Sequence, residues 1–309
     1  MTPEHWWRRR AGCARAMLQE CFVNGLGRTE QMEPRLGAAL GDILARPGSM
    51  LRAMTSYLVG IELGMAETAA RALACGVEYL HTASLIFDDL PAMDDARMRR
   101  GAACVHVVHG EATALLAALA LINRGYAMLW QALRNAEPRR QERAGHWVDA
   151  RLGTAGVIGG QAFDLSGWRA GQSASEVSEV AARKTGELLR LTLVLPAIIG
   201  RGSAREIRLL DRVALLRGLA FQAADDLKDV HGPESGSAKT GGRDEAMGRP
   251  NLVAAEGLEA TLRRFQRLQE MGDRVVAALP GAPERWGMLE LLRVPLPPPS
   301  IRASVPVAG

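Results

Sequence analysis

The chain has 309 residues, of which 48% are hydrophobic and 23% charged, and its formal net charge is +4. This composition is typical of a globular protein, and its low aromatic content of 5% favours helix over sheet. The basic residues are scattered, and the densest run, Arg8 to Arg10, is typical of a solvated helix end. The sequence therefore predicts no nucleic-acid-binding surface.

Helical patterns dominate the chain. Helices are expected over about residues 6–24, 30–45, 50–63, 66–89, 110–135, 139–164, 175–199, 204–230 and 251–278, with a last one near 284–293. The stretch 231–250 is a long glycine- and charge-rich loop, and such loops are usually functional or disordered. Residues 294–309 are proline-rich and are expected to form a loosely ordered tail. We therefore predict one all-α domain over residues 1–309, a helical bundle with its core between long helices.

Cysteine usage and hydropathy bear on location. The four cysteines, Cys13, Cys21, Cys75 and Cys104, form no CxxC pair, which favours reduced thiols and a cytoplasmic protein. The first residues lack the apolar core of a signal peptide. Because we find no apolar run of about eighteen residues, we predict no membrane-spanning segment.

A first acidic cluster, DDLPAMDD, begins at Asp88 after an apolar stretch. Aspartates are rarely buried unpaired and neighbouring carboxylates repel, so a positive partner is expected here. Asp88 and Asp94 are about 240° apart on an ideal helix, so they share a face only if the helix ends between them. Pro91 supplies that end. We expect the helix to stop near Asp89 or Leu90 and a short loop to return Asp94 to Asp88.

A second acidic cluster lies in FQAADDLKDV, residues 221–230. Asp225 and Asp229 share one helix face, whereas Asp226 is rotated by about 100°. Stacked carboxylates suit a hard cation such as magnesium, with water and substrate phosphate completing its shell. A solvated acidic helix end explains either cluster alone, but two such clusters at the ends of apolar helices in one bundle indicate a metal site.

Basic residues near these motifs point to a phosphate-bearing substrate. They are Arg99, Arg100, Lys184, Lys239, Arg243 and Arg249. Arginine matches phosphate oxygens as a planar fork, and lysine acts as a compact charge. Each residue alone is explained as a surface charge, so their nearness to the acidic motifs carries the interpretation.

The stretches LIFDDLPAMDDARMRRG (85–101) and FQAADDLKDV (221–230) together resemble the two aspartate-rich motifs of the trans-isoprenyl diphosphate synthases. The first motif has the DDxxxxD form of bacterial and plant members and is most similar to the geranylgeranyl diphosphate synthases of carotenoid pathways. The resemblance covers roughly residues 40–255. It implies a helical bundle of the isoprenoid synthase type with a central active-site cavity, and a homodimer.

The resemblance also implies a role for each matching residue. About three magnesium ions bridging an allylic diphosphate would be bound by Asp88, Asp89, Asp94, Asp225, Asp226 and Asp229. That diphosphate would contact Arg99, Lys184, Thr185, Gln222 and Lys239. The second substrate, isopentenyl diphosphate, would contact Arg52, His81 and Arg100. The stretch GGQAFDL would place Gln161 and Asp164 beside the reaction chamber.

The chain departs from the family pattern near its N-terminus. Where the family usually carries GGKRLRP, this sequence has PGSMLRA at residues 47–53. Arg52 is kept, but Ser49 replaces the lysine and Met50 replaces an arginine. The loss of one charged hydrogen bond costs about 1.5–3 kcal/mol of binding, or the acceptor substrate differs. A milder departure is GRPN for GKxT, where Arg249 keeps the charge.

The family chemistry needs no protein nucleophile. In the family, magnesium stabilises the leaving diphosphate, an allylic carbocation forms in an apolar chamber, and the double bond of isopentenyl diphosphate attacks it. The departing diphosphate then takes up the proton that is lost. In the family the product length is set by residues before the first aspartate, here Ala83 and Ser84, with Leu80 one turn deeper. Both near positions are small, which favours a twenty-carbon product, geranylgeranyl diphosphate, unless other helices close the tunnel.

Three alternatives remain open at this point, and a fourth is disfavoured. The protein can be a farnesyl or longer-chain polyprenyl diphosphate synthase. It can be a class I terpene cyclase, although DDLKD is unlike the usual second motif of those enzymes. It can be a low-activity or regulatory subunit, a reading that Ser49 supports. A purely structural bundle gives no reason for six aspartates beside apolar helices.

Overall fold

The computed structural model describes residues 3–27, 31–166, 171–229 and 249–295. Lys239, Arg243 and most of the long loop and tail therefore lie outside the described residues. The chain divides into two compact units. Unit 1 comprises residues 1–145, 192–207 and 284–291, and unit 2 comprises residues 146–191, 208–283 and 292–309. The single domain over 1–309 stays a prediction.

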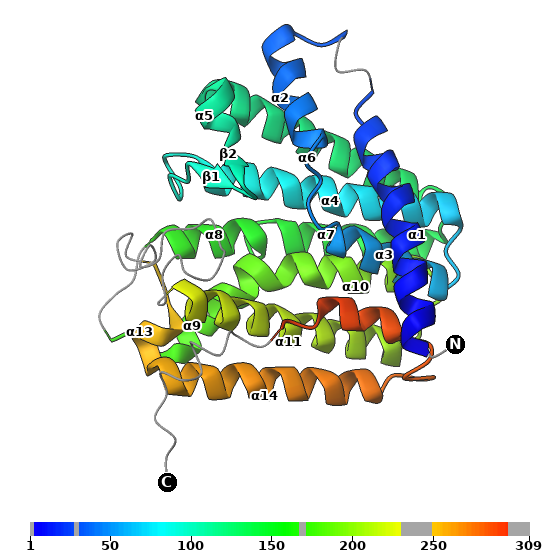
Figure 1. The fold of residues 1–309 in the computed structure, drawn as a ribbon. Helices are drawn as coiled ribbons and strands as arrows, with labels where there is room; N and C mark the ends of the chain where they lie inside the picture. Colours follow the sequence, from blue (N-terminus) through cyan, green and yellow to red (C-terminus); the bar gives the residue numbers. More distant parts are fainter. Residues whose placement is uncertain (1–2, 28–30, 167–170, 230–248, 296–309) are drawn as a thin grey trace. The chain divides into compact units, whose positions relative to one another are not determined.

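Helix α4 is the centre of packing in unit 1. The helices wholly in this unit are α1 Pro3–Asn24, α2 Pro34–Leu44, α3 Leu51–Glu62, α4 Glu67–Asp89, α5 Val105–His109 and α6 Glu111–Leu133 (Figure 1). Helices α4 and α6 approach closely at Gly76, where a Cβ would lie 3.0 Å from the Gly125 carbonyl oxygen. Tyr79 ties α4 to α1, because its ring stacks on Phe22 at 4.7 Å and its hydroxyl donates to the Phe22 carbonyl at 2.6 Å.

Unit 2 is built on a cluster of small and apolar side chains. Its own helical elements are α8 Val157–Leu165, α9 Ala174–Ala181, the π-helical turn η2 Ala182–Gly186, α13 Leu252–Glu256 and α14 Leu258–Ala277. Elements with residues in both units are α7 Pro138–Leu152, α10 Glu187–Ile199, α11 Ala204–Asp229 and the 3-10 helix η4 Gly287–Leu292. The core cluster consists of Val177, Ala220, Ala223, Ala224, Leu227, Leu252, Leu262, Phe265 and Val294. It packs α9, α11, α13 and α14 together.

The predicted fold class is confirmed. Most of the predicted helices exist as predicted, and the two that carry the aspartate motifs match closely, since 66–89 corresponds to α4 and 204–230 to α11. The helix expected near 284–293 is instead the 3-10 turn η4. The helix predicted from residue 30 begins only at Pro34, where proline suits the first helical turn.

Two predicted helices are wrong as single helices, and a third contains a π-helical turn. The stretch 139–164 forms α7 and α8, which are separated by a turn that begins at Gly153. The stretch 251–278 forms α13 and α14, because Gly257 has φ +85°, a conformation outside a helix. The stretch 175–199 contains the π-helical turn η2, and such turns occur frequently at functional sites.

No strand was predicted, but one short hairpin follows the first aspartate motif. Strand β1 (Met98–Arg99) pairs antiparallel with β2 (Ala102–Ala103). The two turn residues, Arg100 and Gly101, have φ of +52° and +77°, as a tight two-residue hairpin turn requires. The hairpin thus fixes the backbone of both arginines in MRRG.

Candidate active site

The first aspartate motif folds back on the end of α4, as predicted. Helix α4 ends at Asp89, and the Asp94 amide donates to the Asp88 carbonyl at 2.9 Å. The intervening turn contains Pro91, which cannot continue the helix. The backbone therefore brings Asp94 beside Asp88, and both residues are partly exposed.

Asp89 is turned inward and is bound by Arg99. The residue is only 4% exposed, and its two carboxylate oxygens accept from Arg99 Nε at 2.6 and 2.7 Å. Burial raises the pKa of the Asp89 carboxyl, and the Arg99 guanidinium partly offsets that effect. In this arrangement Asp89 fixes the side chain of Arg99.

The second motif also contains both partly exposed and buried aspartates. Asp225 and Asp229 are partly exposed on one face of α11, whereas Asp226 is fully buried. Asp226 accepts from Gln222 Nε2 at 2.8 Å and from the Leu252 backbone amide at 2.8 Å. It therefore ties α11 to the start of α13.

The π-helical turn η2 presents the predicted diphosphate contacts of unit 2. Lys184 Nζ lies 2.6 Å from Asp164 Oδ2, and Arg249 Nη1 lies 3.4 Å from the same oxygen. Thr185 Oγ1 donates to Gln222 Oε1 at 3.2 Å. Polar contacts within unit 2 thus form two sets, Asp164 with Lys184 and Arg249, and Thr185 with Gln222. The two sets meet on η2, where Lys184 and Thr185 are adjacent.

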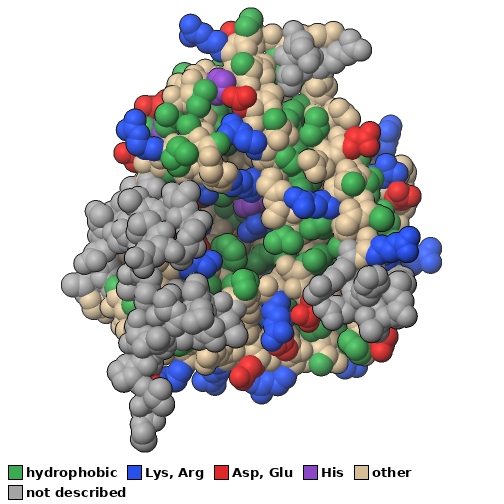
Figure 2. All heavy atoms as spheres, in the orientation of Figure 1, with side chains coloured by type: hydrophobic (Ala, Val, Ile, Leu, Met, Phe, Trp, Pro, Cys, Tyr) green, Lys and Arg blue, Asp and Glu red, His purple; other side chains and the backbone are tan. Residues whose placement is uncertain are grey.

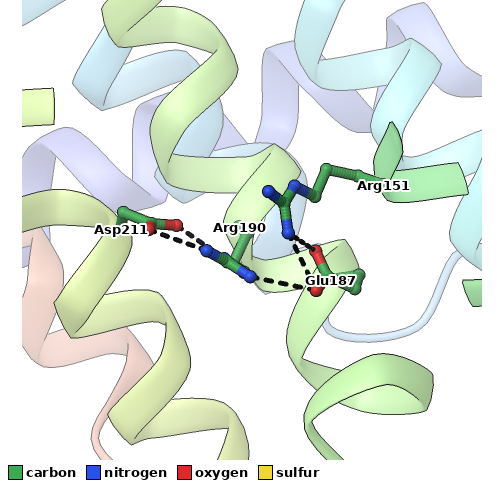
Figure 3. Close-up of polar contacts among 4 residues, drawn as sticks. All are labelled: Arg151, Glu187, Arg190 and Asp211. Atoms are coloured by element: carbon green, nitrogen blue, oxygen red, sulfur yellow. Dashed lines mark hydrogen bonds and ion pairs between the residues drawn. The ribbon is translucent and has the colours of Figure 1, made fainter. Parts of the chain in front are cut away.

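An ion-pair network fixes the helix that follows η2 (Figure 3). Glu187, two residues after Thr185, accepts from Arg151 Nη1 at 3.0 and 3.1 Å and from Arg190 Nη1 at 3.0 Å. Arg190 also binds both carboxylate oxygens of Asp211, at 2.5 and 2.8 Å. The network joins α7, α10 and α11, so it holds the first turn of α10 in place directly behind Lys184 and Thr185.

The donor set in the motifs fits magnesium. Carboxylate oxygens are its preferred ligands, and it usually retains waters and substrate phosphate. The outward carboxylates are Asp88, Asp94, Asp225 and Asp229. Among the described residues no group of three or more histidine, cysteine, aspartate or glutamate side chains forms a ready-made metal site. Phosphate and water oxygens would therefore complete the shell.

A second polar cluster, in unit 1, joins α3 to α4. Arg52 Nη1 lies 3.0 Å from His81 Nε2. Burial, followed by the nearby charges of Arg52 and Arg100, holds the pKa of His81 well below its usual range, so the imidazole is neutral. Because Arg52 donates to Nε2, the ring proton sits on Nδ1. His81 Nδ1 and Arg52 Nε are buried and find no hydrogen-bond partner among the residues that the structure describes.

Glu78 belongs to this cluster and was missed in the sequence. It is buried one turn before His81, and its pKa is raised by burial, with Arg52 and Arg100 opposing the shift. Its carboxylate accepts from the Ala53 amide at 3.4 Å. The available signal was a glutamate three residues before a histidine inside an apolar helix.

The predicted chain-length residues face different directions. Ser84 shares a partly exposed face of α4 with Asp88, four residues later. Ala83 is fully buried and is rotated by about 140° from Asp88. Leu80 packs against α6, where a Cβ at Gly125 would lie 2.9 Å from Leu80 Cγ.

The surface carries charges of both signs. Acidic and basic side chains are interspersed over the described part of the face shown in Figure 2. The four cysteines are free thiols. One described helix, α6, has the length and apolar composition to cross a membrane, a test that core helices of globular proteins also pass.

Comparison with known proteins shows the family of the chain. The family model described as polyprenyl synthetase matches residues 33–276. Farnesyl diphosphate synthase of Escherichia coli (strain K12) is 35% identical over 234 residues, 75% of this chain and 76% of that protein. Geranylgeranyl diphosphate synthase of Pantoea ananas is 34% identical over 247 residues, 79% of this chain and 80% of that protein.

A solved structure agrees at the level of the whole fold. The geranyltransferase of Helicobacter pylori, complexed with magnesium and isoprenyl diphosphate, has a TM-score of 0.80 and 25% identity. The match covers 94% of this chain and 96% of that one. The chain therefore belongs to the polyprenyl synthetase family, the trans-isoprenyl diphosphate synthases.

Proposed function

We propose that the protein is a prenyltransferase that condenses isopentenyl diphosphate with an allylic diphosphate, with geranylgeranyl diphosphate as its main product. The observation that carries this is the paired aspartate motifs at helix ends, in which Asp88 and Asp94, and Asp225 and Asp229, are partly exposed while Asp89 and Asp226 are buried. A terpene cyclase is disfavoured because the second motif is DDLKD, and a regulatory subunit because both motifs are intact.

The allylic diphosphate is assigned to the two motifs. Asp88, Asp94, Asp225 and Asp229 would hold the magnesium, which when bound neutralises the diphosphate and makes it a better leaving group. Lys184 and Thr185 on η2, with Arg99 on β1, would bind the remaining phosphate oxygens as charged and neutral donors. Lys239 is assigned to the same diphosphate from the sequence alone.

Asp89 and Asp226 are assigned supporting roles. Each is buried and already partnered, Asp89 by Arg99 and Asp226 by Gln222 and the Leu252 amide. If either carboxylate moved to bind a metal, it would lose these hydrogen bonds and leave its buried donors without a partner. We therefore assign these two aspartates to orienting Arg99 and Gln222.

The diphosphate of isopentenyl diphosphate is assigned to the cluster of Arg52, His81 and Arg100. The Nδ1–H of His81 and the Nε–H of Arg52 find no partner among the described residues, and buried donors need an acceptor. Phosphate oxygens satisfy both. The two substrates thus use separate sets of residues, one rich in carboxylates and one rich in cations.

Product length is assigned to the α4 face that bears Asp88. Ser84 lies one turn before Asp88 on that face and has a small side chain. A growing chain can therefore pass it. Ala83 stays a candidate, but its side chain lies on the buried side of the helix.

We further propose a cytoplasmic homodimer. Leu116, Leu119, Tyr126 and Trp130 are exposed on one face of α6. Contiguous exposed apolar surface usually marks an interface. Sedimentation of the purified protein as a monomer would contradict this.

The activity test uses purified protein, magnesium, isopentenyl diphosphate and each allylic diphosphate in turn, with product analysis after dephosphorylation. A twenty-carbon alcohol is expected. Cyclic hydrocarbon from an allylic diphosphate alone would indicate a cyclase, and no product would indicate a regulatory subunit.

The metal assignment is tested with matched substitutions. Asp88→Asn or Asp225→Asn, like chelation of magnesium, should lower turnover by about a hundredfold or more, because electrostatic stabilisation of the leaving group is lost. Asp95→Asn is the control, since Asp95 is exposed in the same motif and has no assigned role. Equal activity of all three variants would contradict the metal assignment.

A further inference from the structure

The loop that departs from the family pattern has an unusual backbone. Gly48 and Met50 have φ of +70° and +57°, both in the left-handed region. Met50 is 1% exposed, so it packs into the core, whereas Ser49 between them is exposed. Neither Ser49 nor Met50 brings a positive charge to this loop. The first cation of the cluster, Arg52, follows three residues after Ser49.

Two arginines from other elements approach this loop. Arg15, on α1, directs Nη2 to the Gly48 carbonyl at 3.4 Å. Arg100, in the hairpin turn, directs Nη1 to the Arg46 carbonyl at 3.5 Å. Arg100 also passes directly over Gly48, because a Cβ on Gly48 would lie 2.4 Å from its Cζ. Both guanidinium groups therefore sit beside the backbone that precedes Ser49.

The contacts of Arg15 leave most of its hydrogen-bonding capacity unused. Among the described residues Arg15 makes this one long hydrogen bond and no ion pair. A guanidinium carries five N–H donors. A cation held at one edge by a backbone carbonyl keeps its other donors for an anion.

The charge balance of the neighbourhood also calls for an anion. Arg15, Arg52 and Arg100 lie around the loop and cluster. The buried acid Glu78 acts on both Arg52 and Arg100, and Asp89, which already binds Arg99, also acts on Arg100. Burial raises the pKa of Glu78, and the charges of Arg52 and Arg100 oppose that shift. The unpartnered His81 Nδ1 and Arg52 Nε lie in the same cluster.

We propose that Arg15 supplies, from α1, the cation that the loop lacks at Ser49, and that it binds the diphosphate of isopentenyl diphosphate together with Arg52, His81 and Arg100. This inference rests on the proposed function of that cluster. It assigns a substrate-binding role to a residue outside both aspartate motifs and outside the PGSMLRA stretch.

The test compares Arg15→Gln with Arg9→Gln. Arg9 is an exposed arginine of the same helix, so its substitution makes the same charge change away from the loop. Binding of isopentenyl diphosphate is measured by calorimetry without magnesium, and KM values for both substrates are measured with it. Arg15→Gln should weaken calorimetric binding and raise the KM for isopentenyl diphosphate by about five- to twentyfold, as expected for one charged hydrogen bond. The KM for the allylic diphosphate should stay within about twofold.

Two further variants make the assignment specific. Arg15→Lys should retain most of the binding, because the charge stays. Ser49→Lys in the Arg15→Gln background should restore binding, because it returns a cation to the same loop. Circular dichroism should show no loss of helix in any variant, since Arg15 is exposed.

The inference is overturned if Arg15→Gln binds isopentenyl diphosphate like the wild type, if Arg9→Gln weakens binding equally, or if Ser49→Lys fails to restore it. These results are distinguishable from failure of the proposed function. If the proposed function were wrong, the wild-type protein itself would neither bind isopentenyl diphosphate nor convert it to product.

Discussion

Glu187→Gln should destabilise the protein much more than an ordinary ion-pair substitution. The Glu187 side chain is 6% exposed and accepts from both Arg151 and Arg190 (Figure 3). Loss of its charge leaves two guanidinium groups short of a partner, and breaking a buried pair costs about 3–5 kcal/mol. Arg151 and Arg190 are 23% and 18% exposed, so solvent compensates part of the loss. Arg190 also keeps Asp211, and we expect a decrease of about 2–3 kcal/mol in the free energy of unfolding.

Glu179→Gln is the matched control. Glu179 pairs with Arg183 at 2.6 Å in the same region, but it is 64% exposed, and such helix pairs contribute about 0.3–0.5 kcal/mol. Urea unfolding followed by circular dichroism compares the two variants with the wild type. A cost for Glu187→Gln of no more than about 0.5 kcal/mol, or equal costs for the two variants, would refute the burial argument.

Three further substitutions test individual assignments. Ser84→Phe should shorten the product by one or more isoprene units, as measured by product chromatography, and an unchanged product would mean that another residue limits the chain length. Ala83→Phe should lower the free energy of unfolding by about 1–3 kcal/mol, because the larger side chain overpacks a buried site. Gly48→Ala should raise the KM for isopentenyl diphosphate by about tenfold, because the added Cβ would displace Arg100 and because alanine disfavours the left-handed φ of this residue. An unchanged KM would contradict the assignment of Arg100 as a substrate contact. Burial lowers the pKa of His81 in the folded state, so the unfolded state binds a proton at higher pH than the folded state does. The stability of the wild type should therefore fall as the pH drops below about 6.5. His81→Gln should lose less stability over the same pH range. Parallel acid-unfolding curves for the two proteins would refute that contribution.

Much of the fold follows from the sequence because long amphipathic and apolar periods are local signals. The ends of α4 could be placed from Pro91 and the preceding apolar run. The breaks at Gly153 and Gly257 could not be placed, because glycine is tolerated inside helices and only packing decides whether the helix ends there. Of the two, Gly257 adopts a positive φ. The π-helical turn η2 has no sequence signal of its own, since ARKTGE reads as ordinary helix.

The candidate site was predictable wherever its residues are adjacent in sequence. The aspartate motifs and MRRG are of this kind. Arg15 and Glu78 were missed because their partners lie on other elements, α1 against the Gly48 loop and α4 against α3. Such pairings depend on tertiary packing, and a lone arginine or glutamate in a helix reads as a solvated charge.

The two aspartate motifs show how helix geometry separates roles within one sequence pattern. In each motif the first aspartate of the DD pair is partly exposed, and the second, Asp89 or Asp226, is buried and hydrogen-bonded. Successive residues on a helix differ by about 100°, so two adjacent carboxylates cannot face one ligand equally. A buried carboxylate needs a partner, and here the partners are Arg99 in one unit and Gln222 with the Leu252 amide in the other. The same division arises in two units from unrelated neighbours, so it follows from the helix itself. Under the proposed function, each DD pair would supply one carboxylate for a cation and one for the residues that orient the substrate.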